Sequence, residues 1–181
     1  MTIIEAMKLR KRLAEKAVDL RGKIGQNCAI MDGQSPMYPD QKTKVEGWLQ
    51  SHRDIVQLMG RLSVAIQKTN LLTPVTIVLG NKEVTKSIAE WVVRRRELAP
   101  MDLAAWGQLG DRGLKEQALQ DRQTNEIKII KVIRFFDPSK RDEMKDLFSS
   151  EPSRIDAKLE TVNALTQLAD DIEVNEDALI N

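Results

Sequence analysis

The sequence predicts a mainly α-helical protein with a small β element. Apolar residues recur every three or four positions through most of residues 1–70, as on the buried face of a helix. Runs rich in β-branched residues, near 75–85 and 127–136, interrupt this pattern and predict a β-hairpin and a further strand. A loop-forming stretch at 32–41 divides the helical region, so we expect a long antiparallel helical hairpin or bundle.

The first helical segment is expected over residues 3–31. Its apolar positions share one face and are Ala6, Leu9, Leu13, Ala17, Leu20, Ile24, Cys28 and Met31. At 1.5 Å per residue this helix would be about 40 Å long. The sequence DGQSPMYPDQ at 32–41 is dense in glycine, proline and aspartate and should end it.

The second helical segment carries a seam whose spacing alternates between three and four residues without a break, as in a coiled coil. The seam residues are Val45, Trp48, His52, Ile55, Met59, Leu62, Ile66 and Thr69. A helix of the same chain and a helix of a second copy would bury the same stripe. The sequence therefore leaves both uses of the seam open.

The middle of the chain predicts a tight β-hairpin followed by a third helix. Gly80-Asn81 separates two strand-like runs, as in a two-residue hairpin turn. Thr85 can cap a helix that we expect to stop at Pro100. Three glycines in 101–113 predict an irregular or weakly helical segment there.

The sequence EIKIIKVIRFF at 126–136 is the strongest strand signal of the chain. Both of its faces are largely apolar, so we expect the strand to be covered on both sides. The hairpin at 75–85 is its expected pairing partner.

The C-terminal part predicts two more helices and an acidic tail. Asp137-Pro138 is typical of a helix start, because aspartate caps the helix and proline suits its first position. Pro152 is expected to separate this fourth helix from a fifth. We expect a single domain over 1–181, composed of a helical hairpin at 1–70, a β element with a helix at 74–136, C-terminal helices at 137–170 and the acidic tail at 171–181.

Composition limits the class of protein. With 41% hydrophobic and 30% charged residues, a chain of 181 residues can bury a core and remain soluble. The net charge of +1 provides no overall field toward nucleic acid or an anionic membrane. No apolar run approaches the roughly 20 residues of a membrane span, and the N-terminus is unlike a signal peptide. Cys28 is the single cysteine, so no internal disulfide forms, and we expect synthesis in the cytoplasm.

Charge is nevertheless distributed unevenly along the chain. Residues 1–24 contain seven basic and three acidic residues, whereas residues 170–181 contain five acidic residues and no basic one. These two ends could pair within one chain or between neighbouring copies, and salt would weaken either contact.

No pattern of catalytic, metal-binding or cofactor-binding residues is evident. His52 is the single histidine and lies on the apolar seam, so we interpret it as structural rather than as a general base. One cysteine and one histidine cannot supply a zinc site unless chains share it. Neither GxGxxG nor GxxxxGK[ST] occurs, which leaves nucleotide binding without support. We expect no enzyme activity, no metal and no cofactor.

Arg94, Arg95 and Arg96, close to Trp91, form the most suggestive basic cluster, because guanidinium groups suit phosphates and aromatic rings stack on bases. Successive residues of a helix point in different directions, however, and Glu90 and Glu97 dilute the charge. We therefore interpret the tryptophans as core or interface anchors, and keep nucleic-acid binding through these arginines as an alternative.

Four segments of the sequence resemble the septicolysin-like family of small bacterial proteins, which also has relatives in phage genomes. They are AIQKTNLLT (65–73), GNKEVT (80–85), SIAEWVVRRRELA (87–99) and RIDAKLETVNALTQL (154–168). The resemblance implies a long helical hairpin with a small β element, a tendency to self-associate and no established enzymatic site.

Together these observations predict a non-enzymatic structural protein that forms homo-oligomers through helical seams. A component of a phage head or tail is the expected role, with other virion proteins as further partners. A cytoplasmic bacterial oligomer is the alternative, and neither a membrane nor nucleic acid is an expected partner. The candidate interface residues are Trp48, His52, Ile55, Met59, Leu62, Ile66, Trp91, Arg95 and Trp106.

Overall fold

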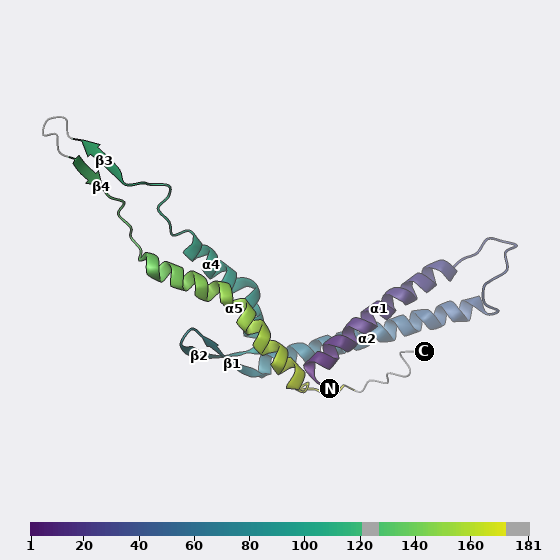
Figure 1. The fold of residues 1–181 in the computed structure, drawn as a ribbon. Coiled ribbons are helices and arrows are strands. Elements are labelled where there is room, and N and C mark those ends of the chain that lie inside the picture. The colour runs from purple at the N-terminus through teal and green to yellow at the C-terminus, as the bar shows by residue number, and fades with distance from the viewer. Residues whose placement is uncertain (121–126, 173–181) are drawn as a thin grey trace. The chain divides into compact units, whose positions relative to one another are not determined.

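A computed structural model describes residues 1–120 and 127–172 and is mainly helical, with short antiparallel strands (Figure 1). This confirms the predicted class. Contacts divide the chain into two compact units, which we describe separately. The first unit contains Met1–Pro74, Ser87–Ala89 and the chain from Leu159 onward, and the second contains Val75–Lys86 and Glu90–Lys158. The single domain expected from the sequence stays a prediction.

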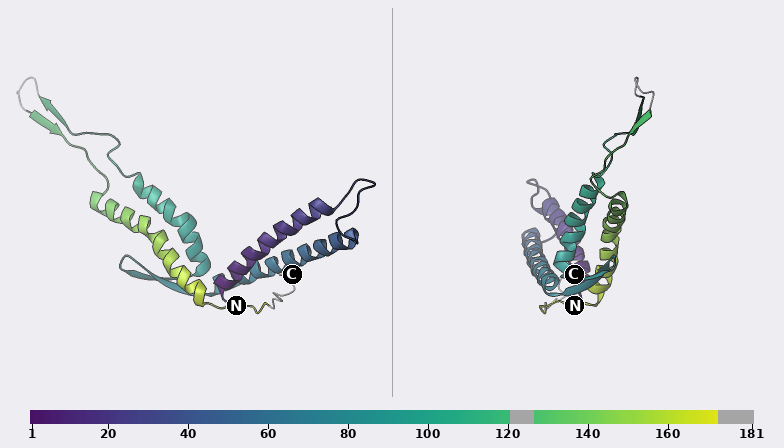
Figure 2. Two further views of the ribbon diagram at one scale, coloured as in Figure 1. Left: turned by 45° about the vertical axis from the view of Figure 1, so that its right-hand side comes forward. Right: turned by 90° about the vertical axis from the view of Figure 1, so that its left-hand side faces the viewer.

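In the first unit, α1 (Ile3–Asn27) and α2 (Gln41–Leu72) lie side by side in every view (Figures 1 and 2). Helix α1 ends four residues before the predicted position, so Cys28 and Met31 are exposed beyond it. Hydrogen bonds fix this end, because the Asn27 amide donates to the Lys23 carbonyl and Gln41 Nε2 donates to the Asn27 carbonyl.

The faces that α1 and α2 bury consist of small and branched apolar residues. The buried residues are Ile3, Ala6, Leu9, Leu13, Ala17 and Leu20 on α1, and Ile55, Leu58, Leu62, Ala65, Ile66 and Thr69 on α2. Those of α1 confirm the predicted stripe as far as Leu20. On α2 the predicted seam residues Ile55, Leu62, Ile66 and Thr69 are buried, while Val45, Trp48, His52 and Met59 are half-buried.

The N-terminus is held by the chain that follows α5 (Pro138–Leu165). Ile3 N donates to the Thr166 carbonyl, and Leu168 N donates to the Met1 carbonyl, each over 3.0 Å. The buried Thr69 side chain accepts a hydrogen bond from Ala169 N, and Lys68 pairs with Asp170 at 2.6 Å. These contacts connect the beginning and the end of the described chain within the first unit.

In the second unit, β1 (Pro74–Leu79) and β2 (Lys82–Ser87) form the predicted hairpin. Gly80 in the turn has a φ of +60°, which favours glycine. The two strands are linked by a hydrogen bond of 2.7 Å between the hydroxyls of Thr76 and Thr85. The prediction that Thr85 caps a helix is wrong, because Thr85 lies within β2.

Helix α3 (Ile88–Val93) continues through a π-helical turn at Arg94–Leu98 into α4 (Ala99–Gly107). The predicted stop at Pro100 is therefore wrong, and 101–107 is regular helix. In an uninterrupted α-helix the ring of Pro100 would clash with the carbonyl four residues earlier. The wider turn, in which Ala99 N bonds to the Arg94 carbonyl, accommodates the proline.

Strands β3 (Gln117–Gln120) and β4 (Ile127–Ile130) form a separate antiparallel sheet, with Gln117 opposite Ile130 and Gln120 opposite Ile127. The predicted strand at 126–136 is thus shorter than expected, and Glu126 lies outside the described residues. Its predicted pairing with the 75–85 hairpin is wrong. Pairing with a segment that is nearer in sequence closes a shorter loop and costs less entropy.

Helix α5 begins at Pro138, as predicted, and the Asp137 carboxylate accepts hydrogen bonds from Ser139 N and Lys140 N. The predicted break at Pro152 is wrong, because α5 continues through it as one helix (Figure 2). A proline removes one backbone hydrogen bond and bends a helix, but packing elsewhere can keep the helix continuous. Of the predicted acidic tail, residues 173–181 lie outside the described residues.

Candidate protein interaction surfaces

The predicted seam residues lie mainly inside the first unit. Ile55, Leu62 and Ile66 are buried on the face of α2 that packs within this unit, so they are not accessible to another protein in this conformation. His52 and Met59 lie at the margin of the same face and are half-buried. Within residues 1–120 and 127–172, no histidine, cysteine and carboxylate side chains group as metal ligands would.

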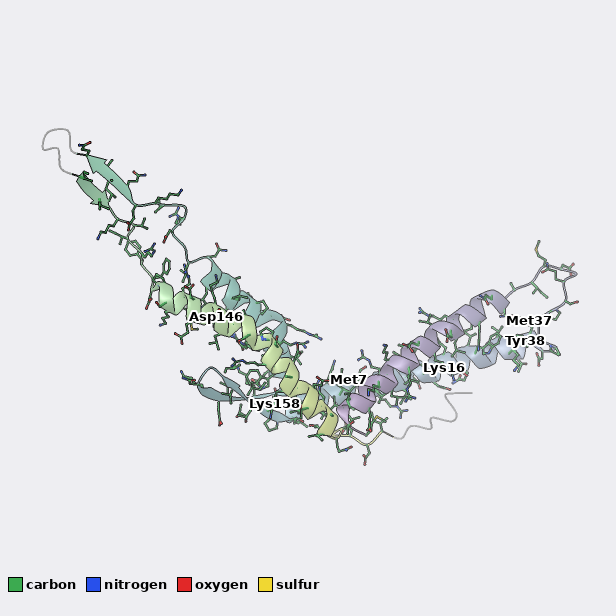
Figure 3. All side chains as sticks on the ribbon, viewed as in Figure 1. Met7, Lys16, Met37, Tyr38, Asp146 and Lys158 are labelled. Atoms are coloured by element: carbon green, nitrogen blue, oxygen red, sulfur yellow. The ribbon has the colours of Figure 1, made fainter. Side chains whose placement is uncertain are left out.

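The three tryptophans have different environments. Trp91 is fully buried in the second unit, and its Nε1 donates to the Val75 carbonyl over 2.8 Å. Trp106 is half-buried on α4. Trp48 is half-buried on α2 and meets the Tyr38 ring edge-on, with 5.6 Å between the ring centres. Tyr38 belongs to the segment that connects α1 and α2 (Figure 3).

The arginine cluster is largely neutralised by carboxylates of the same unit. Arg94 donates from Nε and Nη2 to the two carboxylate oxygens of Glu151, at 2.6 and 2.8 Å, and from Nη1 to Asp102 at 2.5 Å. The hydrogen bonds that Arg94 donates to Glu151 raise the pKa of Arg94 despite its partial burial. Arg95 pairs with Asp156. The sequence could not reveal these partners, because Glu151 and Asp156 are remote along the chain.

The most exposed apolar surface of the second unit lies on what we call the arm, residues 114–120 and 127–136. Exposure is 98% for Phe135, 77% for Ile133 and 68% for Ile127. The other apolar residues of the arm that are at least half exposed are Leu114, Leu119, Ile129 and Ile130. The sequence correctly indicated a β-rich apolar segment, but the expectation that it is covered on both sides is wrong.

The pairing of β3 with β4 determines how the arm's apolar residues divide between its two faces. Ile127 and Ile129 share one face, opposite Gln120 and Ala118, since directly paired residues of antiparallel strands lie on the same side. Ile130 and Leu119 lie on the other face. A sheet exposed to water normally has one polar face, so this sheet has the composition of one that is covered.

The base of the arm is tied to the helices of its unit. Arg134 donates two hydrogen bonds of 2.6 Å to the Asp111 carboxylate, which lower the pKa of Asp111. Arg141 on α5 lies 5.6 Å from the centre of the Phe136 ring and donates to the Leu109 carbonyl. These contacts hold both ends of the arm while leaving its apolar residues uncovered.

A signal of this exposure was present in the sequence. Lys128, Lys131 and Arg134 recur at every third position of the predicted strand. Because side chains of a strand alternate between faces, this spacing places basic residues on both sides. A fully covered strand would have to bury some of these charges, which is costly without a partner.

The fold and these surfaces define a mainly helical protein with uncovered apolar β structure. Residues 10–168 match the family described as "Family of unknown function (DUF6847)", and the chain belongs to this family. No curated protein matches the chain. Among the described residues, none of the helices is sufficiently long and apolar to cross a membrane.

A solved structure described as a functionally unknown conserved protein from Corynebacterium diphtheriae has a similar fold, with a TM-score of 0.54. The two sequences are 19% identical, and the match covers 93% of this chain and 98% of that one. At this identity the likeness concerns the fold alone. Neither comparison bears on the septicolysin-like resemblance, which stays a prediction.

Proposed function

We propose that the protein is a non-enzymatic assembly protein that binds further copies of itself, and that the arm makes one of the contacts. The observation that carries this proposal is the exposure of Ile127, Ile133 and Phe135 at 68%, 77% and 98%. Monomeric proteins rarely expose apolar patches of more than a few hundred Å². Seven large apolar residues of the arm are at least half exposed, which supports an interaction site there.

A second copy of the chain is the partner that the arm fits best. A sheet of two strands is only marginally stable alone, and three or more strands are normally needed. Two β4 strands related by a two-fold axis run antiparallel and can extend the sheets into one of four strands. This pairing would also place Ile127 and Ile129 beside the apolar residues of the other copy.

The proposed particle is a phage head or tail, in which the α1–α2 pair serves as the long helical hairpin predicted from the sequence. A cytoplasmic bacterial oligomer is the alternative form of the same proposal. Mass spectrometry of purified virions from the source strain distinguishes the two, since only a virion component remains with the particles through density-gradient purification.

The arm is tested with the substitution Ile129→Lys in the full chain. In the joined sheet a charge at this position would replace an apolar cross-strand contact between the two β4 strands and lie close to the same charge of the other copy, so we expect the mass from light scattering to fall relative to the unaltered protein. Val78→Lys is the matched control, because Val78 is a similarly exposed apolar strand residue, at 53%, outside the arm. Equal masses for the unaltered protein and Ile129→Lys would overturn the role of the arm.

Nucleic-acid binding through the arginine cluster gains no support from the geometry. The guanidinium groups of Arg94 and Arg95 are bonded to Glu151, Asp102 and Asp156, so a phosphate would have to displace carboxylates. We therefore do not extend the proposal to nucleic acid.

A further inference from the structure

We propose that the outer face of α2 is a second self-association surface, which packs antiparallel against α2 of another copy around a two-fold axis at Gly60. This inference rests on the proposed self-association but not on the arm. Helix α2 has a second apolar stripe besides the buried one. Its members are exposed by 50% to 66% and are Leu49, Val56, Val64 and Leu71.

These residues lie on one side of the helix, which is nearly opposite the buried face. They share that side with Gly60 and with two polar residues, Arg53 and Gln67, which lie seven positions on either side of Gly60 and would meet each other in the pair. Their spacings of seven, eight and seven residues are close to whole numbers of helical turns, so the stripe stays on one side. It extends for about 33 Å at 1.5 Å per residue. A helix that is apolar on two faces is typical of one that packs against neighbours on both.

The stripe is symmetric about Gly60 in both spacing and residue type. Val56 and Val64 each lie four positions from Gly60, and Leu49 and Leu71 each lie eleven positions from it. In an antiparallel pair centred at Gly60, leucine therefore meets leucine and valine meets valine. A two-fold interface needs a surface that is complementary to itself, which makes a second copy the occupant that this face fits.

Gly60 lies where the two helices would approach most closely. A Cβ atom added there would have no neighbour within 4 Å in the isolated chain. Packing within the chain therefore does not require glycine at this position, and glycine is an unfavourable helix residue. A small residue at the crossing point allows two helices to come close, which gives the glycine a role in the pair.

Charges beside the stripe favour the antiparallel orientation. Asp54, Arg61 and Lys68 are spaced by seven and lie on one flank of the stripe. Antiparallel packing keeps this flank of both copies on one side of the pair and places Asp54 of each copy near Lys68 of the other, while Arg61 lies beside Arg61 of the other copy at the axis. Parallel packing places the two flanks on opposite sides of the pair, so these attractive contacts are not made. Within the chain, Asp54 accepts a hydrogen bond from Gln50 and Lys68 pairs with Asp170, and both side chains remain partly exposed.

The contact is small for a stable interface. One helix per copy over about 33 Å buries less than the roughly 800 Å² per partner that is typical of stable complexes. We therefore expect dissociation in the micromolar range from this surface alone, so the mass has to be measured over concentrations from about 10 to 300 µM.

The test is Gly60→Leu in the full chain, with the arm disabled by Ile129→Lys. The bulky side chain would separate the two helices at the axis, and we expect a concentration-dependent dimer to become a monomer. Gly22→Leu is the matched control, since Gly22 lies within α1 and its Cβ would likewise meet open space. Thermal unfolding checks the fold, and its midpoint should stay the same or rise in both variants, because leucine is the better helix former.

Orientation is tested by cysteine cross-linking in a Cys28→Ser background. Leu49→Cys mixed with Leu71→Cys should form disulfide-linked dimers on mild oxidation, while neither variant alone should do so. Cross-linking of each variant with itself would contradict the antiparallel arrangement. If Ile129→Lys is already a monomer while the unaltered protein is not, the proposed α2 contact is wrong and the arm alone accounts for assembly. If the unaltered protein is itself a monomer, the α2 contact and the arm contact are both wrong.

Discussion

At the scale of single residues, Glu151 makes the most consequential polar contact in the second unit. Its side chain is 1% exposed and is bonded to Arg94 through both carboxylate oxygens. A buried ion pair is not in itself strong evidence of net stabilisation, because both charges lose hydration. Removing Glu151 is costly, however, since Arg94 would keep only the partly exposed Asp102 as a partner.

We predict that Glu151→Ala destabilises the protein by about 3 kcal/mol, in the range found when one member of a buried pair is removed. Asp156→Ala is the comparison, because the Asp156 side chain is 54% exposed and an exposed pair contributes at most about 1 kcal/mol. Urea unfolding followed by circular dichroism measures both. Equal losses of stability in the two variants would contradict the central position of Glu151.

A pH effect is expected at Asp111. The hydrogen bonds from Arg134 lower the pKa of this carboxyl below its ordinary value. A lowered pKa in the folded state stabilises the fold above the ordinary pKa, and this contribution is lost as the pH falls through the folded-state value. The contact at the base of the arm should therefore persist at neutral pH and weaken in acid.

An NMR titration of the Asp111 carboxyl carbon measures this directly. We expect a midpoint below the value of about 3.9 for an unperturbed aspartate, and a midpoint closer to that value in Arg134→Gln. A normal midpoint in the unaltered protein would show that the Arg134 contact is not formed in solution.

Predictability from sequence differs among residues for a physical reason. The Asp137 cap and the glycine turn at Gly80 depend on backbone geometry within a few residues, so the sequence alone indicates them. The Arg94–Glu151 pair joins residues 57 positions apart. Its formation depends on how α5 packs, which local patterns do not contain.

At the scale of elements, α1 begins with a reciprocal capping arrangement. The Thr2 hydroxyl accepts a hydrogen bond from Glu5 N, and Thr2 N donates to the Glu5 carboxylate over 2.8 Å. The hydrogen bond from the Thr2 backbone contributes most to lowering the pKa of Glu5. These bonds satisfy two backbone groups that a helix start otherwise leaves free.

Thr2→Ala should therefore cost about 1 kcal/mol of unfolding free energy. Ser51→Ala within α2 is the control, because Ser51 is an exposed residue of the helix interior, where its loss removes no helix cap. Chemical denaturation of both variants measures the difference. A loss in Ser51→Ala as large as that in Thr2→Ala would contradict the capping role.

The helices were predictable where the apolar spacing is regular, and less so at the prolines. Pro100 and Pro152 both lie within helical stretches that local rules would interrupt. At Pro100 a π-helical turn relieves the clash, and at Pro152 the adjacent Glu151 is held by Arg94. Tertiary contacts thus outweigh the local preference of proline at Pro152.

The strand at 126–136 shows a different reason for error. Apolar residues on two faces predict coverage, but they do not identify what provides it. The structure places neither the 75–85 hairpin nor another described segment over the arm. If the covering partner is a second copy, no pattern within one chain's fold can locate it.

At the scale of the whole molecule, the arm and the outer face of α2 are the two surfaces that we propose for self-association. A chain with one self-association surface forms a dimer and no larger assembly. A chain with two different self-association surfaces can link dimers into a larger assembly. This combination suits a structural subunit. It also explains why blocking either surface alone should reduce the assembly without abolishing it.

The mass of the unaltered full chain in solution, measured by light scattering over a concentration series, tests self-association most directly. We predict a mass above that of a monomer that rises with concentration and falls to the monomer value when Ile129→Lys and Gly60→Leu are combined. A monomer at every concentration up to about 300 µM would contradict the account.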